Sequence, residues 1–223
     1  MRLTPEDHAK VTAAVTAAEA QTDGEIVTVV ARASDKYHDV ALHWSVLAML
    51  LVLALLAVFP GVAAGIHLRL IDAWAQETPV SAYYTIALVL MAVTFLVMRV
   101  LLASVPVRMA LTPGATKERR VRAKALELFR IGAEKRTKAA TGVLLYLSLA
   151  EHRAELIADE AIHGRVSEDV WGHAMAALVT AVKDGRPGDG MAAAVGEIGV
   201  VLAEHFPRSE GDTNELPDRL IEL

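Results

Sequence analysis

Two long apolar runs dominate the first half of the chain. They cover about residues 42–66 and 80–102; the first lacks Asp, Glu, Lys and Arg throughout, and the second lacks them through Met98. At about 1.5 Å per residue, roughly 20 apolar residues cross a hydrocarbon core of about 30 Å. The pattern predicts a hairpin of two transmembrane helices over residues 41–104. The alternative, two buried helices of a soluble core, is disfavoured because so short a chain can hardly cover them.

The segments on either side of the hairpin alternate between helical and strand patterns. The predicted elements are a helix at 5–20, a strand at 25–33, a helix at 116–136, strands at 142–149 and 154–158, and helices starting near Ser167 and Asp189. Neither side alone has enough strand for a stable sheet. We therefore expect one α/β domain, a small sheet sandwiched by helices, formed by residues 1–40 and 105–206 with the hairpin inserted between them. Residues 207–223 are polar and predict a flexible tail.

Lysine and arginine are distributed unevenly around the two runs. The connection at 66–79 holds only Arg69, whereas seven basic residues follow the second run: Arg99, Arg108, Lys117, Arg119, Arg120, Arg122 and Lys124. Excess positive charge marks the cytoplasmic side of a membrane. We expect the N-terminus and the C-terminal domain in the cytoplasm and the short loop outside. The cluster at 119–124 would also suit anionic lipid head groups, and topology alone explains it equally well.

Composition excludes several classes of function. The formal net charge of -5 gives no electrostatic reason to expect nucleic acid as a partner. The absence of cysteine excludes disulfides, thiolate catalysis and cysteine metal sites. The first ten residues are polar and do not resemble a signal peptide, so we expect the first apolar run to act as an anchor.

Acidic side chains gather near the ends of the predicted strands. Asp23 and Glu25 open the first strand, and Asp159 and Glu160 follow the third. With Arg136 from a basic connection that also holds Lys135 and Lys138, they could form a phosphate or divalent-ion site. The candidate catalytic residues are Asp159, Glu160 and Arg136. The candidate metal ligands are Asp23, Glu25 and Asp159, for calcium or another divalent cation, although calcium takes six to eight oxygen ligands.

A structural role for the same residues is the favoured alternative. Asp23 and Glu25 would then belong to a turn, and Asp159 would cap a helical turn. The chain shows no HExxH spacing, no Gly-rich phosphate loop and no GxSxG elbow. Whether the protein is an enzyme therefore stays open at this point.

The chain outside the hairpin resembles the TPM domain family. The residues that carry the resemblance are the stretches 22–26, 141–148 and 151–158, with Arg136 and the pair Asp159 and Glu160. The resemblance implies an α/β sandwich with helices on both sides of a small sheet. Some members are thylakoid-lumen proteins linked to photosystem II assembly and repair, with acid-phosphatase activity and calcium binding described for some. Others are accessory subunits of a membrane receptor.

The inserted hairpin departs from the secreted pattern and looks like a bacterial, membrane-anchored subset of that family. We therefore expect a multi-pass protein of a bacterial inner membrane, in contact with the lipid bilayer. Its expected function is that of an accessory or assembly subunit of an integral-membrane complex. Small residues in both runs would allow close helix packing. The alternative is a membrane-tethered phosphatase or other hydrolase with a divalent-ion site.

Overall fold

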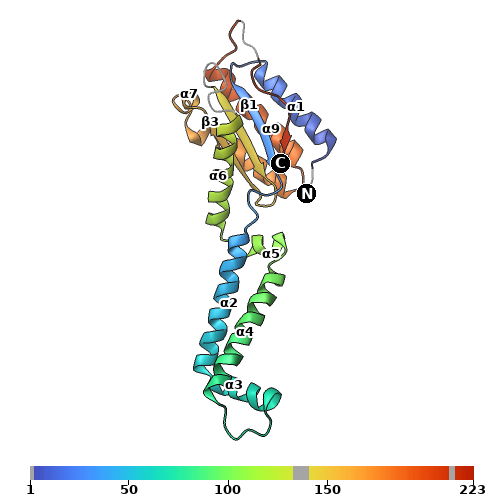
Figure 1. Cartoon of the computed structure of the whole chain (residues 1–223). Helices are drawn as coiled ribbons and strands as arrows, with labels where there is room; N and C mark the ends of the chain where they lie inside the picture. Colours follow the sequence, from blue (N-terminus) through green and yellow to red (C-terminus); the bar gives the residue numbers. More distant parts are fainter. Residues whose placement is uncertain (1–2, 133–140, 211–213) are drawn as a thin grey trace. The chain divides into compact units, whose positions relative to one another are not determined.

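The computed structural model describes residues 3–132, 141–210 and 214–223. The chain forms two compact units (Figure 1). One unit combines Met1–Asp35 with Pro113–Leu223, and the other is Lys36–Thr112. Each unit is described by itself below.

The first unit is built on a four-stranded sheet with the order β3-β2-β1-β4. Its strands are β1 (Glu25–Ala31), β2 (Gly142–Ser148), β3 (Arg153–Ala158) and β4 (Ile221–Glu222). β1 pairs in parallel with β2 and with β4, while β2 and β3 form an antiparallel hairpin. All seven residues of both β1 and β2 are buried, as the near-continuous apolar runs predict for parallel strands covered on both faces.

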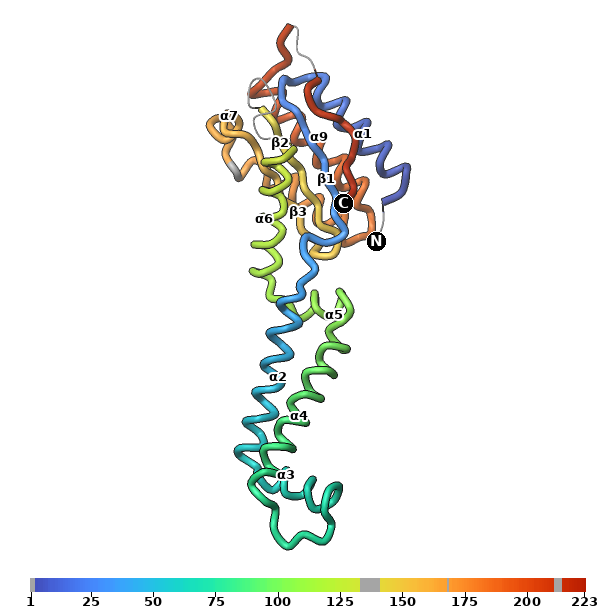
Figure 2. Tube along the Cα trace, in the orientation of Figure 1, coloured from blue at the N-terminus to red at the C-terminus, as the bar shows by residue number. Residues whose placement is uncertain are grey.

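Helices cover both faces of this sheet (Figure 2). They are α1 (Pro5–Glu19), α6 (Gly114–Gly132), α7 (Glu160–His163), α8 (Gly172–Lys183) and α9 (Pro187–His205), with a short 3-10 turn, η2 (Glu168–Trp171), before α8. Alternate residues of β2 divide between two cores. Val143 and Leu145 pack with α1, α8 and α9, whereas Leu144 and Tyr146 pack with α6. The predicted α/β sandwich is confirmed.

The C-terminal segment differs from the predicted flexible tail. Its last residues form β4, in which Ile221 lies opposite Val29 of β1. Leu216 and Leu220 of the same segment are buried, at 7% and 5% exposure. A two-residue strand among polar residues has no periodic pattern, so the sequence gives no signal for it.

The second unit contains two long apolar helices, α2 (His38–Val58) and α4 (Val80–Leu101). Both are long and apolar enough to cross a membrane. The first apolar run is not one helix: it breaks at Phe59 and continues as α3 (Pro60–Ile66) and a π-helical turn, η1 (His67–Ile71). Pro60 lacks the N–H that would continue α2, so a new helix starts there. A short helix, α5 (Val105–Ala110), follows α4 and was not predicted.

The two long helices pack on each other through a small cluster. Leu56, Ala63 and Ile86 are its buried members. Most other large apolar side chains of α2 and α4 remain exposed, including Leu51 at 62% and Leu96 at 62%. The unit therefore covers little of its own apolar surface.

A close crossing of α1 and α9 generates the first prediction. A methyl group at Gly199 would lie 2.5 Å from Cβ of Ala18, whereas one at Gly196 of the same helix would meet nothing within 4 Å. We expect Gly199→Ala to lower the free energy of unfolding by about 1–3 kcal/mol because it overpacks the crossing. Gly196→Ala should raise that free energy by about 0.5–1 kcal/mol. Thermal unfolding of the full chain, followed by circular dichroism, measures both; equal effects would contradict the close crossing.

Candidate functional site

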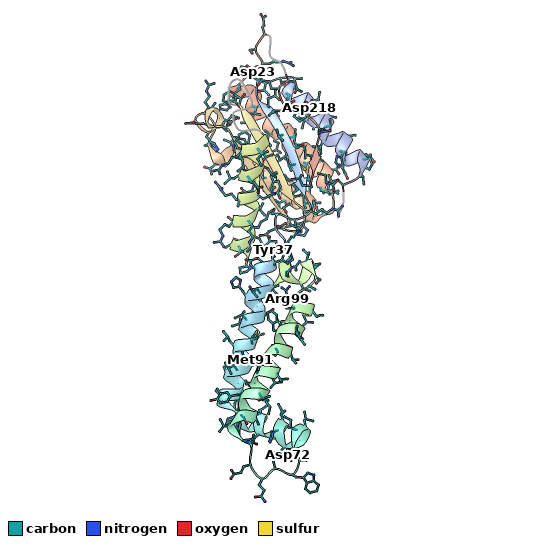
Figure 3. All side chains as sticks on the ribbon, viewed as in Figure 1. Asp23, Tyr37, Asp72, Met91, Arg99 and Asp218 are labelled. Atoms are coloured by element: carbon teal, nitrogen blue, oxygen red, sulfur yellow. The ribbon has the colours of Figure 1, made fainter. Side chains whose placement is uncertain are left out.

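Two of the predicted acidic residues, Glu25 and Asp159, lie at the same end of the sheet. β1 and β2 start there, and β3 ends there, so Glu25 and Asp159 flank the start of β2. The Glu25 N–H donates to the Thr141 carbonyl at 3.2 Å. On the other side, Asp159 Oδ2 accepts the Gly142 N–H at 3.1 Å, and the Asp159 N–H donates to the Gly142 carbonyl at 2.9 Å. Figure 3 labels Asp23 in the same unit.

The carboxylates of Asp23 and Glu25 accept hydrogen bonds from the C-terminal segment. Asp23 Oδ1 accepts the N–H of Ser209 at 2.7 Å and its hydroxyl at 3.1 Å. The two oxygens of Glu25 accept the N–H groups of Glu215 at 3.2 Å and Leu216 at 3.1 Å. Glu25 is only 4% exposed. Both carboxylates thus hold the C-terminal segment against the start of β1.

The candidate catalytic residues are placed only in part. Asp159 is buried and occupies the N-cap position of α7, but its side chain makes no capping hydrogen bond and accepts from β2 instead. Glu160, the next residue, is exposed in the first turn of α7. Arg136 lies outside the described residues, as do Lys135 and Lys138. The catalytic set and the metal-ligand set stay predictions.

Glu19 is a buried acid that the sequence interpretation missed. It ends α1 at 8% exposure, and its Oε1 accepts the Ile26 N–H at 2.8 Å. Its other carboxyl oxygen is buried without a hydrogen-bond partner. Burial, with the negative charges of Glu25 and Asp218 nearby, raises the pKa of Glu19 to about 8. The group is therefore protonated at neutral pH.

The sequence does contain a signal for Glu19. Glu19 is four positions after Val15 and eight positions after Val11, so it lies on the same face of α1 as these two apolar residues. An acid on this face of the helix is either buried in the core, or the helix ends before the acid would reach the core. Neighbouring Asp218 behaves in the opposite way: burial alone would raise its pKa, but hydrogen bonds from Thr16, at 2.6 Å, and Asn214 hold the pKa below its ordinary value.

A second buried polar cluster lies at the opposite end of the sheet, where β1 and β2 finish. Glu151 Oε1 accepts the Ser34 N–H at 2.9 Å, and Glu151 Oε2 accepts the Ser148 hydroxyl. The hydroxyls of Ser34 and Tyr146 are 3.0 Å apart. Burial raises the pKa of the Tyr146 hydroxyl. The sequence signal is the alternation of Tyr146 and Ser148 on one face of an otherwise apolar strand.

The described side chains do not assemble into a recognisable metal centre. Within residues 3–132, 141–210 and 214–223, no group of three or more His, Asp or Glu residues is placed so that it could hold an ion.

Comparison with protein families assigns a domain type to part of the chain. Residues 103–201 match the family model TPM_phosphatase, described as the TPM domain. Residues 103–201 thus contain a TPM domain. The name TPM domain is used below for the whole unit that holds the sheet. The predicted resemblance is thereby confirmed. A search of curated proteins found no match.

A solved structure shares the fold of the TPM domain described here. It is the NMR structure of BA42 protein from the psychrophilic bacterium Bizionia argentinensis. The two chains are 17% identical, with a TM-score of 0.56, and the alignment covers 100% of this chain and 97% of the other. In this chain α1 and β1 precede the family match, yet they pack into the same sheet and core.

The Glu19 carboxyl generates a pH prediction. Its folded-state pKa is raised from 4.5 to about 8, so the folded state keeps a proton that the unfolded chain releases between these values. The free energy of unfolding should fall as pH rises through this window, by at most about 1.4 kcal/mol per unit for this group, and should level off above pH 8. Glu19→Gln should remove this slope because an amide still accepts from Ile26 and cannot ionise.

Denaturant titrations of the full chain between pH 5 and pH 9 measure this slope. Glu6→Gln, on the exposed side of the same helix, is the matched control and should leave the slope unchanged. A wild-type slope that persists in the Glu19→Gln variant would contradict the buried, protonated carboxyl.

Proposed function

We propose that this protein is a membrane-anchored TPM domain protein that acts as an accessory or assembly subunit of an integral-membrane complex. The observation that carries the proposal is the exposure of its apolar helices. Only 22% of the most apolar window of α2 and 6% of that of α4 is buried. A soluble core helix would be mostly buried, and exposed apolar surface of this extent requires lipid or a protein partner.

The exposed residues lie along the length of α4. Leu88 is 68% exposed, Leu96 is 62% exposed and Val100 is 74% exposed. Ala63 and Ala87, in contrast, take part in packing within the hairpin. The large side chains therefore leave a wide apolar surface for acyl chains and for transmembrane helices of the complex.

We infer the orientation from the basic residues. Arg69 is the one Lys or Arg of the loop at 66–79, whereas basic residues follow α4 in number. The positive-inside rule then places the TPM domain in the cytoplasm of a bacterium and the loop outside its inner membrane. The cluster at 119–124 would lie where anionic lipid head groups are within reach.

The carboxylates of the TPM domain also favour a non-enzymatic role. Backbone N–H groups bind Glu25, Asp23 and Asp159 in the folded protein. A carboxylate that already binds two donors has less capacity for a cation or a reacting group. Asp23 and Glu25 hold the C-terminal segment in place, and this structural role does not require a catalytic one.

A tethered phosphatase with a divalent-ion site is the second candidate. The name of the matching family model refers to phosphatases. The structural observation in its favour is that Glu25 and Asp159 lie at the same end of the sheet, on either side of the start of β2. Asp159, Glu160 and Arg136 would then act on the phosphate, and Asp23 would help to hold the ion.

Native purification tests the accessory role. We expect the full chain, tagged after Leu223 and extracted in mild detergent, to co-purify with a membrane complex in stoichiometric amount. A reporter enzyme inserted at residue 76 in the same membranes should be active only outside the cytoplasm. Free monomer alone would contradict the subunit role, and a cytoplasmic reporter would contradict the topology.

Hydrolysis of a generic phosphoester tests the second candidate. If the protein is a phosphatase, Asp159→Asn should reduce kcat at least 100-fold, on the order expected for loss of a catalytic acid or base. Asn keeps the shape of the side chain and the acceptor for the Gly142 N–H. Asp169→Asn, an exposed acid in η2, is the matched control. Activity that is unchanged in Asp159→Asn eliminates this candidate.

A further inference from the structure

β3 forms one edge of the sheet, and half of its backbone groups point away from β2. The Asp159 N–H donates to the Gly142 carbonyl, and these residues are opposite each other in the register. Hydrogen-bonded pairs alternate along an antiparallel ladder, so Glu155 and Ile157 bond to β2. Ala154 and Leu156 therefore turn their N–H and C=O groups to the free edge. Between described residues, no backbone hydrogen bond beyond the ladder reaches these groups.

A groove follows this edge between two helices. It consists of two hollows of about 280 Å³ and 440 Å³ that share Ala154. Arg122 and Leu126 of α6 line one wall. The other wall is α8, where Met175 and Val179 face the groove one turn apart. The free backbone groups thus lie at the floor of the groove, and its apolar wall side chains are Leu126, Met175 and Val179.

Both hollows of the groove carry basic side chains. Arg122 and His163 line the first hollow, and Lys183 and His152 line the second. All four side chains belong to exposed residues. Arg153, also in the second hollow, is engaged by Glu118 at 3.3 Å.

Two acids also line the groove. Glu151 is 7% exposed, and its oxygens accept from Ser34 and Ser148. Glu155 lines the first hollow; burial raises its pKa, and Arg122 opposes that shift. Each hollow therefore offers a ligand one Arg or Lys side chain, Arg122 in the first and Lys183 in the second.

We propose that this groove binds an extended segment of a partner protein, which adds to β3 as a fifth strand and carries an acidic residue at each end of a short apolar stretch. Main-chain hydrogen bonds to Ala154 and Leu156 supply the pairing, as in other cases of strand addition. Apolar side chains at alternate positions pack on Met175 and Val179. The six residues of β3, Arg153–Ala158, span about 17 Å at the usual rise of a strand, which fits a partner strand of about five residues between the acids.

This inference rests on the proposed accessory role, because it names the chemistry of the partner segment. A second copy of this chain is a less suitable occupant. Pairing of two β3 edges would bring Arg122 and Lys183 of one groove near the same basic residues of the other, and like charges disfavour this contact.

A labelled peptide tests the groove with the full chain in detergent. The probe is a blocked peptide, Glu-Val-Thr-Val-Thr-Val-Glu, with fluorescence anisotropy as the readout. We expect saturable binding, about fivefold or more weakening when both Glu are replaced by Lys, and loss of binding when alternate backbone nitrogens are methylated. Hydrogen exchange of the Ala154 and Leu156 amides should slow in the complex.

Matched variants of the protein locate the binding. Arg122→Glu with Lys183→Glu should weaken the peptide about fivefold or more, whereas Arg119→Glu with Arg130→Glu, on α6 but outside the groove lining, should not. Ala154→Pro removes one outward N–H and leaves the bonds to β2, so it should abolish binding while the circular dichroism spectrum is kept.

Each other outcome counts against the groove. Absence of binding, equal binding of the methylated peptide, or equal effects of the two double variants would overturn the proposal. Dimerisation of the full chain that Ala154→Pro abolishes would assign the edge to a second copy and overturn it as well. A complex that co-purifies with wild type and with the groove variants alike would leave the accessory role intact while it removes the groove, so the two failures are distinguishable.

Discussion

The parallel pairing of β1 with β2 is the interaction on which the TPM domain depends. Glu25 lies opposite Gly142 and Ala31 opposite Ser148, although the entire apolar hairpin separates the two strands in sequence. Both strands are buried along their full length, so helices must cover both faces of the sheet. The entropy of closing so long a loop is recovered only because the pairing creates two cores at once.

Carboxyl groups hold the periphery of this sheet to its centre. Glu25 binds two backbone N–H groups of the C-terminal segment, and Asp159 joins the end of β3 to the start of β2. Glu19 is buried near Glu25, and burial raises its pKa to about 8, so it keeps its proton at neutral pH. The hydrogen bonds of these acids give each of them a structural role. We therefore rank the proposed accessory role above the proposed phosphatase activity.

The two units present different surfaces. The hairpin exposes apolar side chains that need lipid or protein around them. The TPM domain exposes the outer edge of β3 in a groove that Arg122 and Lys183 line. The proposals join these surfaces in one description: an anchor that positions the protein in a membrane, and an edge that takes a strand from a partner.

Elements with a local signal could be predicted from the amino-acid sequence. The apolar runs, the β-branched strands and the helix start at Thr4, with its reciprocal bonds to Asp7, all follow from neighbouring residues. The contacts of the acids, in contrast, depend on how the chain packs. The partners of Glu25 are 190 and 191 residues away, and β4 is two residues long. Contacts of this kind arise when distant segments pack together, so no periodicity in the chain records them.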